Sequence, residues 1–428
     1  MILSKSANPI WRRDVLAWCC YDWANSGYTT LMITVFAVYM QRTVFSSETS
    51  GTTGAVVWAW SVAISMLVGA LLSPLVGALA DARAGKRFGL AITAIGGGAA
   101  CMLMAIIPPA NTWQVVSCFV AANLCLELSL TLYNGFLPEV ANEQEMNRVS
   151  AAGMAFGYFG GGLALLLAML VLSFGPRFGF NEPAVLLRVC IFATGAWWCL
   201  FTIPTVIVLR DQPRPVSSGS IRESGSKAFA DVVDTLRNLR HHRTLAFFLI
   251  AFLFYNDGLQ TVISQASTFA IQELKFTDRE LIAVILMVQF IATPGAIFTG
   301  WISDRLGRKN TLVICLVVWV VLLASASFVQ TKAAYWVMCV GVALVLGGTQ
   351  AVSRAIMGSL TPRGHEARYF GFFNLSGKAT SFMGTFFFGL VIATTGSSRA
   401  AIVGRLAFFV VGLAIVARLD LRNSRVQQ

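Results

Sequence analysis

Long apolar runs separated by short polar loops occupy almost the whole chain. A helix needs about 20 mostly apolar residues to cross a bilayer. Runs of this length predict twelve transmembrane helices, which cover approximately residues 15–40, 55–80, 88–108, 113–136, 150–174, 186–209, 244–270, 280–302, 310–330, 334–354, 368–395 and 398–418. The pattern therefore predicts an all-α membrane protein.

The segment from residue 210 to residue 243 is the one long hydrophilic stretch between these runs. It divides the chain into an N-terminal six-helix half (1–209), a linker (210–243) and a C-terminal six-helix half (244–428). Within the linker, apolar residues recur at helical spacing from Lys227 to Leu239, which predicts an amphipathic helix. Such a basic helix is expected to lie along the anionic inner leaflet, although a plain covalent link explains the segment equally well.

The charge distribution sets the expected orientation. Charged residues make up 12% of the chain, against about 25% in a typical soluble domain. The net charge is +12, but most of the 32 Lys and Arg residues, Arg354 among them, fall in alternate loops on the side of the termini. The positive-inside rule places that side in the cytoplasm, so the charge reflects topology and not nucleic-acid binding. We expect a monomer, in the plasma membrane if the source is bacterial.

Motifs for enzyme chemistry or metal binding are missing from the sequence. The nine cysteines lie in or beside apolar runs, without a CxxC pair or a metal-like Cys/His spacing. The HExxH, GxSxG and phosphate-loop patterns are absent as well. We therefore expect no enzyme activity, no metal and no cofactor.

Two loops of similar sequence stand at equivalent places in the two halves. Gly77 and Gly300, like Asp81 and Asp304, are 223 residues apart. The predicted gating residues are Gly77, Asp81, Gly85, Lys86 and Arg87 in the first loop and Gly300, Asp304, Arg305, Gly307, Arg308 and Lys309 in the second. Each glycine permits close helix approach, and each aspartate is expected to accept bonds from the cations or from a neighbouring helix end. A topology signal alone is the simpler alternative.

Charged and amide side chains interrupt several of the predicted membrane helices. An ionised group is costly in lipid, so such residues usually face a protein interior or a water-filled cavity. The candidates for substrate binding and ion coupling are Asp22, Asn25, Glu127, Asp257, Gln350, Asn374 and Lys378. On the seventh helix, the face expected to line a cavity carries Asp257, Thr261, Gln265 and Thr268. A buried Lys378 needs an anionic partner, and three carboxylates are available; a structural salt bridge is the alternative for any one of them.

The paired loops resemble the signature loops of the major facilitator superfamily, which join helices 2 to 3 and 8 to 9. Further stretches are similar to the vacuolar amino-acid effluxer family associated with autophagy and to its bacterial relatives. These stretches are 21–26 (YDWANS), 137–139 (LPE), 156–161 (FGYFGG), 255–258 (YNDG), 347–354 (GGTQAVSR) and 370–378 (FGFFNLSGK). The resemblance implies a twelve-helix major facilitator fold, with helices 1, 4, 7 and 10 lining the central path. It suggests export of small solutes, with amino acids the nearest precedent.

These features predict a secondary transporter that works by alternating access, because the sequence has no ATP-binding motif. We expect Asp22, Glu127 or Asp257 to carry a coupling proton and Lys378 to hold an anionic group of the substrate. The expected partners are a small-molecule substrate, the lipid bilayer and protons. Two alternatives stay open: a lipid or glycolipid flippase on the same fold, and a membrane receptor or scaffold that does not transport.

Overall fold

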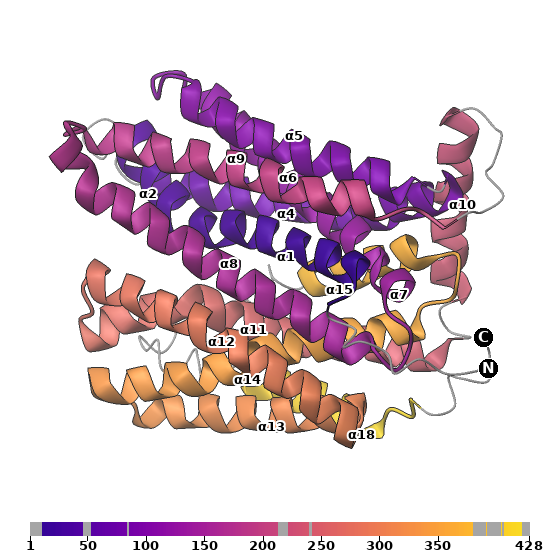
Figure 1. Cartoon of the computed structure of the whole chain (residues 1–428). Coiled ribbons are helices and arrows are strands. Elements are labelled where there is room, and N and C mark those ends of the chain that lie inside the picture. The colour runs from indigo at the N-terminus through magenta and orange to yellow at the C-terminus, as the bar shows by residue number, and fades with distance from the viewer. Residues whose placement is uncertain are drawn as a thin grey trace.

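The computed structural model describes residues 11–45, 53–83, 85–212, 221–238, 242–379, 391, 404 and 406–421. Two groups of long helices lie side by side, one from the N-terminal part of the chain and one from the C-terminal part (Figure 1). Nine helices within the described residues are long and apolar enough to cross a membrane. The prediction of an all-α membrane protein is confirmed.

The N-terminal group begins with α1 and ends with α9. Its elements are α1 (Arg13–Leu31), a π-helical segment (Met32–Phe36), α2 (Ala37–Tyr39), a second π-helical segment (Met40–Val44), α4 (Thr53–Arg83), α5 (Lys86–Ile106), α6 (Thr112–Gly135), α7 (Leu137–Val140), α8 (Met146–Phe174), a 3-10 turn (Gly175–Phe178) and α9 (Pro183–Val208). The candidates Asp22 and Glu127 lie in the middle of α1 and α6, away from the helix ends.

The C-terminal group runs from α11 to α18. Its elements are α11 (Arg243–Leu274), α12 (Asp278–Leu306), α13 (Arg308–Ser325), a 3-10 turn (Ala326–Phe328), α14 (Lys332–Leu360), α15 (Glu366–Ala379) and α18 (Leu406–Arg418). The predicted ranges 368–395 and 398–418 therefore lie partly outside the described residues.

The helix α14 is longer than predicted, and this changes the position of Arg354. The sequence pattern placed the helix end at residue 354, whereas α14 continues to Leu360. Small and apolar residues carry the helical pattern onward, and Thr361, which precedes Pro362, adopts an extended conformation. A residue before proline is disfavoured in the helical region, so the helix ends there and Arg354 lies inside it.

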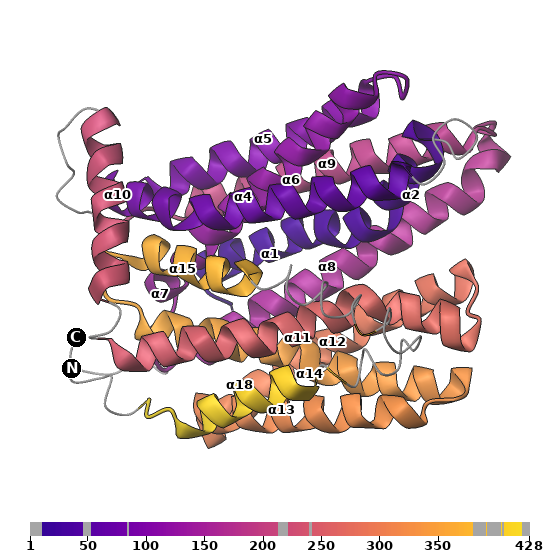
Figure 2. The same cartoon turned by 180° about the vertical axis from the view of Figure 1, so that it is seen from behind.

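A transverse helix, α10 (Ile221–Asn238), lies across one end of the bundle (Figures 1 and 2). We call this end the α10 end and the other the opposite end. The helix begins six residues before the predicted start at Lys227. It packs on α4. In the predicted apolar stripe, Val232 and Val233 are half-buried and Val232 packs against the core, while Phe229 and Leu236 are exposed. The predicted apolar stripe is therefore divided, because one part of it contacts the protein and the other part is exposed.

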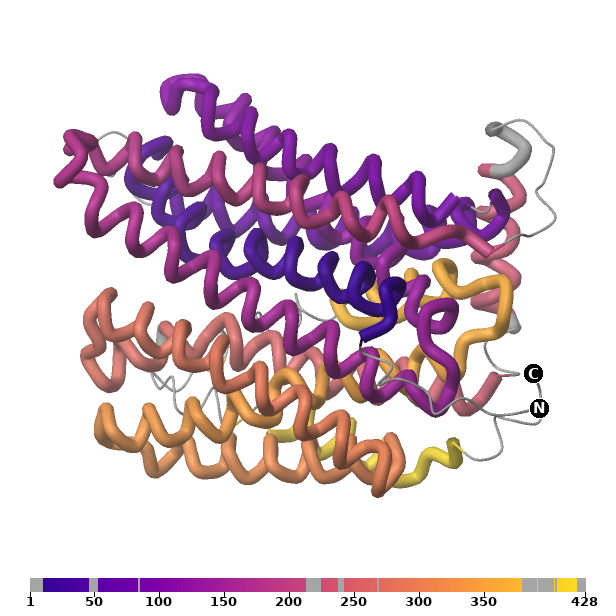
Figure 3. Tube along the Cα trace, in the orientation of Figure 1, coloured from indigo at the N-terminus to yellow at the C-terminus, as the bar shows by residue number. Residues whose placement is uncertain are grey.

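The two groups meet along two seams on opposite sides of the bundle. In one seam α15 packs against α4 and α6, and in the other α8 packs against α12 and α14. The tube in Figure 3 shows α8 leaning from the N-terminal group toward the C-terminal group as it approaches the α10 end. Both seams need glycine: a Cβ on Gly371 would lie 2.5 Å from Pro74 Cα, and one on Gly300 would lie 2.5 Å from Ala151 Cβ.

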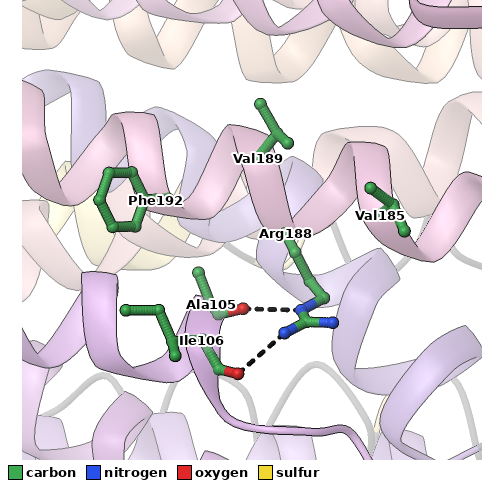
Figure 4. A pocket seen from close by; sticks show the side chains of 6 residues that line it. All are labelled: Ala105, Ile106, Val185, Arg188, Val189 and Phe192. Atoms are coloured by element: carbon green, nitrogen blue, oxygen red, sulfur yellow. Dashed lines mark hydrogen bonds between the residues drawn. The ribbon is translucent and has the colours of Figure 1, made fainter. Parts of the chain in front are cut away.

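A separate hollow of about 300 Å³ lies between α5 and α9 (Figure 4). The Arg188 guanidinium fills its centre and donates to the carbonyl oxygens of Ala105 at 2.6 Å and Ile106 at 2.8 Å. These carbonyls belong to the last turn of α5, which lacks intrahelical partners for them. We therefore assign Arg188 a structural role within the N-terminal group.

Candidate functional site

A cavity of about 540 Å³ lies between the two helix groups. Its polar lining residues include Asp22, Asn25, Asn123, Glu127, Asn134, Tyr158, Asn256, Gln260, Gln289, Gln350, Arg354, Asn374 and Lys378. Its lining also reaches Leu281 and Tyr335, near the starts of α12 and α14 at the opposite end. The volume falls in the range of small-molecule sites, which is about 300–1,000 Å³.

An ion pair between the two groups forms part of the cavity wall. Lys378 Nζ of α15 lies 3.2 Å from Glu127 Oε1 of α6. Asn374, one turn earlier on α15, donates to the Glu127 carbonyl oxygen at 3.2 Å and to Ser73 Oγ at 2.9 Å. Glu127 is 1% exposed, and its second carboxylate oxygen has no hydrogen-bond partner among the described residues. The structure therefore places Lys378 beside one of the three carboxylates predicted for it and leaves an acceptor at the cavity.

A second ion pair, between Asp22 of α1 and Arg354 of α14, joins the two groups. Arg354 Nη1 lies 2.9 Å from Asp22 Oδ2, which also accepts a hydrogen bond from Tyr133 Oη at 2.7 Å. The Arg354 guanidinium donates to Ser150 Oγ at 3.1 Å and to its carbonyl oxygen at 2.7 Å, and lies 4.6 Å from the Trp18 ring centroid. Arg354 is 3% exposed. This cation of the C-terminal group is thus surrounded by partners from the N-terminal group.

Sequence reasoning missed the role of Arg354, because it counted this residue with the loop cations of the terminal side. A signal was present: six residues without charge follow it and continue the helical pattern up to Thr361. A cation followed by almost two further helical turns is inside a helix and needs a partner there. Asp22 was recognised as a buried charge, but its partner lies 332 positions away in the chain.

A neutral pair of side chains also lines the cavity. Tyr158 Oη of α8 donates to Gln350 Oε1 of α14 at 2.7 Å. Asn25 lines the cavity as well, although its Nδ2 is already bonded within α1, to the Tyr21 carbonyl oxygen at 2.8 Å. Gln350 was predicted from the sequence as a site residue, whereas Tyr158 was not.

Asp257 does not lie where the sequence analysis expected it. It is fully buried in α11, but the cavity lining on this helix includes Asn256, Gln260 and Ile263. Neighbouring residues of a helix point in directions that differ by about 100°. The helix face that lines the cavity is therefore rotated by one residue from the predicted face. The predicted cavity face through Asp257 is corrected to the face through Asn256 and Gln260.

The first predicted gating loop contacts the start of α15. Asp81 accepts hydrogen bonds from the backbone N–H groups of Ala367 at 3.2 Å and Arg368 at 2.8 Å. A carboxylate at a helix N-terminus accepts hydrogen bonds from N–H groups that have no partner within the helix. Its negative charge is also stabilised by the positive end of the helix dipole. Lys86 is 1% exposed and pairs with Glu139 at 2.5 Å and Glu366 at 3.7 Å. Asp81 and Lys86 thus connect the N-terminal group to α15.

The residues around these contacts hold the loop in place. Asp211 accepts from the backbone N–H groups of Lys86 at 2.9 Å and Arg87 at 3.2 Å, which are the first of α5. Gly85 precedes them with a φ of −114°, a value open to any residue. The first loop therefore has no left-handed glycine at Gly85, in contrast to Gly307 in the second loop.

The second predicted gating loop contacts the start of α8. Asp304 accepts from the side chains of Arg148 and of Asn147, the latter at 3.1 Å. Arg308 donates to Asn147 Oδ1 at 2.7 Å and to the Glu143 carbonyl oxygen. Asp304 thus uses side-chain donors of α8, whereas Asp81 uses the backbone of α15. The two loops tie their groups together by different chemistry at equivalent positions.

Three further residues predicted in the second loop contribute to its local structure or lie beside it. Gly307 has a φ of +81°, in the left-handed region that favours glycine. The Arg305 guanidinium lies 3.7 Å from the Trp301 ring centroid. Lys309 is half-buried in the first turn of α13.

The Gly77→Ala variant is expected to prevent closure of the seam at the α10 end. A Cβ on Gly77 would lie 2.2 Å from the Ala367 carbonyl oxygen, closer than real contacts allow. We expect transport to fall at least tenfold, measured as solute flux in proteoliposomes. The matched control is Gly85→Ala, whose Cβ would lie 3.9 Å from Arg83 Cβ. Equal flux in both variants would contradict a close contact at this seam during transport.

Comparison with known proteins shows which of them this chain resembles. The family described as "Vacuole effluxer Atg22 like" matches residues 41–428. The MFS-type transporter YxiO of Bacillus subtilis is 29% identical over 412 residues, which cover 94% of this chain and 93% of that protein. Autophagy-related protein 22 of Kluyveromyces lactis is 28% identical over 323 residues, covering 69% of this chain and 63% of the fungal protein.

Solved structures show the same fold at low sequence identity. The proton:xylose symporter XylE of the major facilitator superfamily has a TM-score of 0.72 at 14% identity, with 94% of each chain covered. The human organic anion transporter MFSD10 has a TM-score of 0.70 at 13% identity, covering 94% of this chain and 98% of that one. The family match over most of the chain and these folds agree with each other. The chain therefore belongs to the vacuole effluxer Atg22-like family of major facilitator superfamily transporters.

Proposed function

We propose that this transporter exports small zwitterionic solutes such as amino acids by alternating access, in exchange for protons. The observation that carries the proposal is the Lys378–Glu127 pair, 3.2 Å apart in the wall of a cavity between the helix groups. A substrate carboxylate would bind Lys378 and a substrate ammonium group would bind Glu127. Charge-assisted hydrogen bonds of this kind contribute about 1.5–3 kcal/mol each.

The contacts at the α10 end support an outward-facing state. Asp81, Lys86, Asp304 and Arg308 close that end, while the cavity lining extends to Leu281 near the opposite end. The positive-inside distribution of Lys and Arg supports a cytoplasmic position for the α10 end. Release of these contacts would let the two groups rock and expose the cavity to the cytoplasm.

Glu127 is the best-supported carrier of the coupling proton among the three predicted carboxylates. Asp22 is bonded to Arg354 and Tyr133, and Asp257 lies off the cavity lining. Glu127 combines burial, one oxygen without a described partner and an adjacent cation. A proton on Glu127 would remove the anion that binds the substrate ammonium group, so proton and substrate compete for this site, as exchange requires.

Flux measurements in proteoliposomes test the proposed function. Purified protein is reconstituted, and a mixture of radiolabelled amino acids is offered with and without a pH difference across the membrane. We expect accumulation against the amino-acid gradient only when the pH difference is present. Equal distribution of every amino acid in both conditions, with intact protein, would reject this substrate class.

The variants Asp304→Ala and Arg308→Ala are expected to slow transport several-fold without weakening substrate binding. Asp304 loses its bonds to Arg148 and Asn147, so the closed α10 end becomes less stable while the cavity is unchanged. The measurements are flux in proteoliposomes and ligand-induced thermal stabilisation in detergent. Glu182→Ala is the control, because this exposed glutamate lies in the loop before α9, away from the second loop. A normal rate would reduce the loop to a topology signal.

A lipid or glycolipid flippase is the second candidate, and the apolar part of the lining favours it. Residues of α11 and α12 that line the cavity include Val262, Ile263, Val284, Ile285 and Val288. Such a wall suits the chain of an amphiphile. Proteoliposomes with fluorescent phospholipid in both leaflets distinguish the candidates, because a flippase would expose the inner-leaflet label to an external quencher.

A further inference from the structure

Two pairs of polar side chains occupy equivalent positions in the two helix groups. Glu127 and Gln350 are 223 residues apart, as Asp81 and Asp304 are. Lys378 and Tyr158 are 220 residues apart, as Arg368 and Arg148 are. The ion pair Lys378–Glu127 therefore has the neutral pair Tyr158–Gln350 as its counterpart under the internal repeat.

The two pairs lie in the two different seams. Lys378–Glu127 joins α15 to α6, and Tyr158–Gln350 joins α8 to α14. In Figure 1 α8 runs across the front of the bundle, and in Figure 2, from behind, α15 is in front. The pairs thus stand on opposite sides of the cavity that they both line. A solute between them meets a charged wall on one side and an uncharged hydrogen-bonding wall on the other.

Gln350 is one of three carboxamides in the lining, with Asn134 and Gln260, whose amide nitrogen donates to no described residue. Its Oε1 accepts from Tyr158, but its Nε2 donates to no described residue, and the side chain is partly exposed in the lining. Asn25, Asn256 and Gln289 use their amide nitrogens on protein oxygens. A donor held in place by a tyrosine and left open to a cavity suits an oxygen acceptor on a ligand.

We propose that Tyr158 and Gln350 form a second, uncharged subsite that binds a neutral hydrogen-bonding group of the substrate, such as a carboxamide or hydroxyl group. This inference rests on the proposed function, because it assumes that the charged end of the solute occupies Lys378 and Glu127. The subsite makes the transporter select zwitterions with a neutral polar side chain. Apolar side chains would leave Gln350 Nε2 without a partner, and a buried unpaired donor is disfavoured.

Binding of matched amino acids to the purified full-length protein in detergent tests this selectivity. The probes are L-glutamine and L-norleucine, which have side chains of similar length, and binding is measured by titration calorimetry. The parent protein is expected to bind L-glutamine about three- to tenfold more tightly, the effect of one hydrogen bond. In Gln350→Met and in Tyr158→Phe this ratio should fall to about one, with L-norleucine affinity retained.

A matched control and a gain of function separate a subsite from a structural contact. Gln289→Met removes another carboxamide of the lining, whose Nε2 donates to Thr30 Oγ1. It is expected to change the affinities for both probes alike. Gln350→Glu places an anion at the subsite. This variant should therefore bind L-lysine at least tenfold more tightly than the parent protein does. A merely structural role for Gln350 gives no such gain.

The outcomes identify which proposal fails. Binding of both probes with a ratio that Gln350→Met and Tyr158→Phe leave unchanged overturns the neutral subsite and preserves the proposed function. If the parent protein binds none of the three amino acids, the proposed substrate class fails, and the subsite that depends on it fails too. Retained L-norleucine binding in each variant shows that the variant is folded.

Discussion

Glu127→Gln is expected to retain exchange of substrate across the membrane and to lose accumulation driven by a pH difference. Glutamine keeps the size and polarity of the side chain but cannot release a proton. Glu127 has a position that fits this role, since it is 1% exposed, lines the cavity and lies 3.2 Å from Lys378 Nζ. Counterflow of labelled substrate and uptake under an imposed pH difference measure the two activities separately in the same proteoliposomes.

Two companion variants make this result specific. Glu182→Gln alters an exposed glutamate in the loop before α9 and should leave both activities unchanged. Lys378→Ala should weaken substrate binding itself, by about 10- to 100-fold for the loss of a charge-assisted hydrogen bond. If Glu127→Gln still accumulates substrate under a pH difference, the coupling assignment is wrong. If Lys378→Ala binds normally, Lys378 has a structural role only.

Arg354→Met is expected to move the protein away from the state in which the α10 end is closed. Removing one partner of a buried ion pair costs about 3–5 kcal/mol, because the other charge stays buried. The substitution destabilises mainly the state with the closed α10 end, because the contacts it removes join the two helix groups. Arg354 belongs to one group, and its partners Asp22, Tyr133 and Ser150 belong to the other. A shift of about 5.5 kcal/mol converts a 99:1 population into 1:99, so most molecules are expected to leave this state.

Labelling of an introduced cysteine measures this shift. Ile263→Cys places a thiol in the cavity lining, where a charged, membrane-impermeant reagent reaches it from the opposite end. The unmodified chain gives the background from the nine native cysteines.

Adding Arg354→Met should reduce the labelling rate at least twofold, and Asp22→Asn should act in the same direction. Arg188→Met is the matched control, because Arg188 bonds to carbonyl oxygens within its own group. Unchanged labelling in folded Arg354→Met protein would contradict a state-dependent role for the pair.

Much of the fold could be predicted from the sequence because it depends on local and repeated features. Apolar runs longer than a bilayer crossing predict helices irrespective of their neighbours. The 223-residue repeat of Gly77 and Asp81 in Gly300 and Asp304 located two equivalent loops. Burial of Asp22 and Glu127 and the half-buried position of Lys378 followed from charges inside apolar segments, since such charges avoid lipid.

The choice of partners, in contrast, was decided only by the tertiary structure. Helical periodicity groups residues on a face, but the angle and register at which two helices cross determine which face meets which partner. One residue of rotation separates Asn256, which lines the cavity, from Asp257, which does not. The same packing pairs Arg354 with Asp22 and Lys378 with Glu127, although the partners come from opposite parts of the chain.

The two gating loops contain features that the sequence determines and contacts that it does not determine. The sequence by itself determined that both loops carry a glycine, an aspartate and basic residues at equivalent places. Only the packing decided that Asp81 binds the backbone N–H groups that begin α15, while Asp304 binds the side chains of Arg148 and Asn147. An aspartate accepts either kind of donor, so its partner is set by the donors that the neighbouring helix brings within about 3 Å, and no local pattern contains that information.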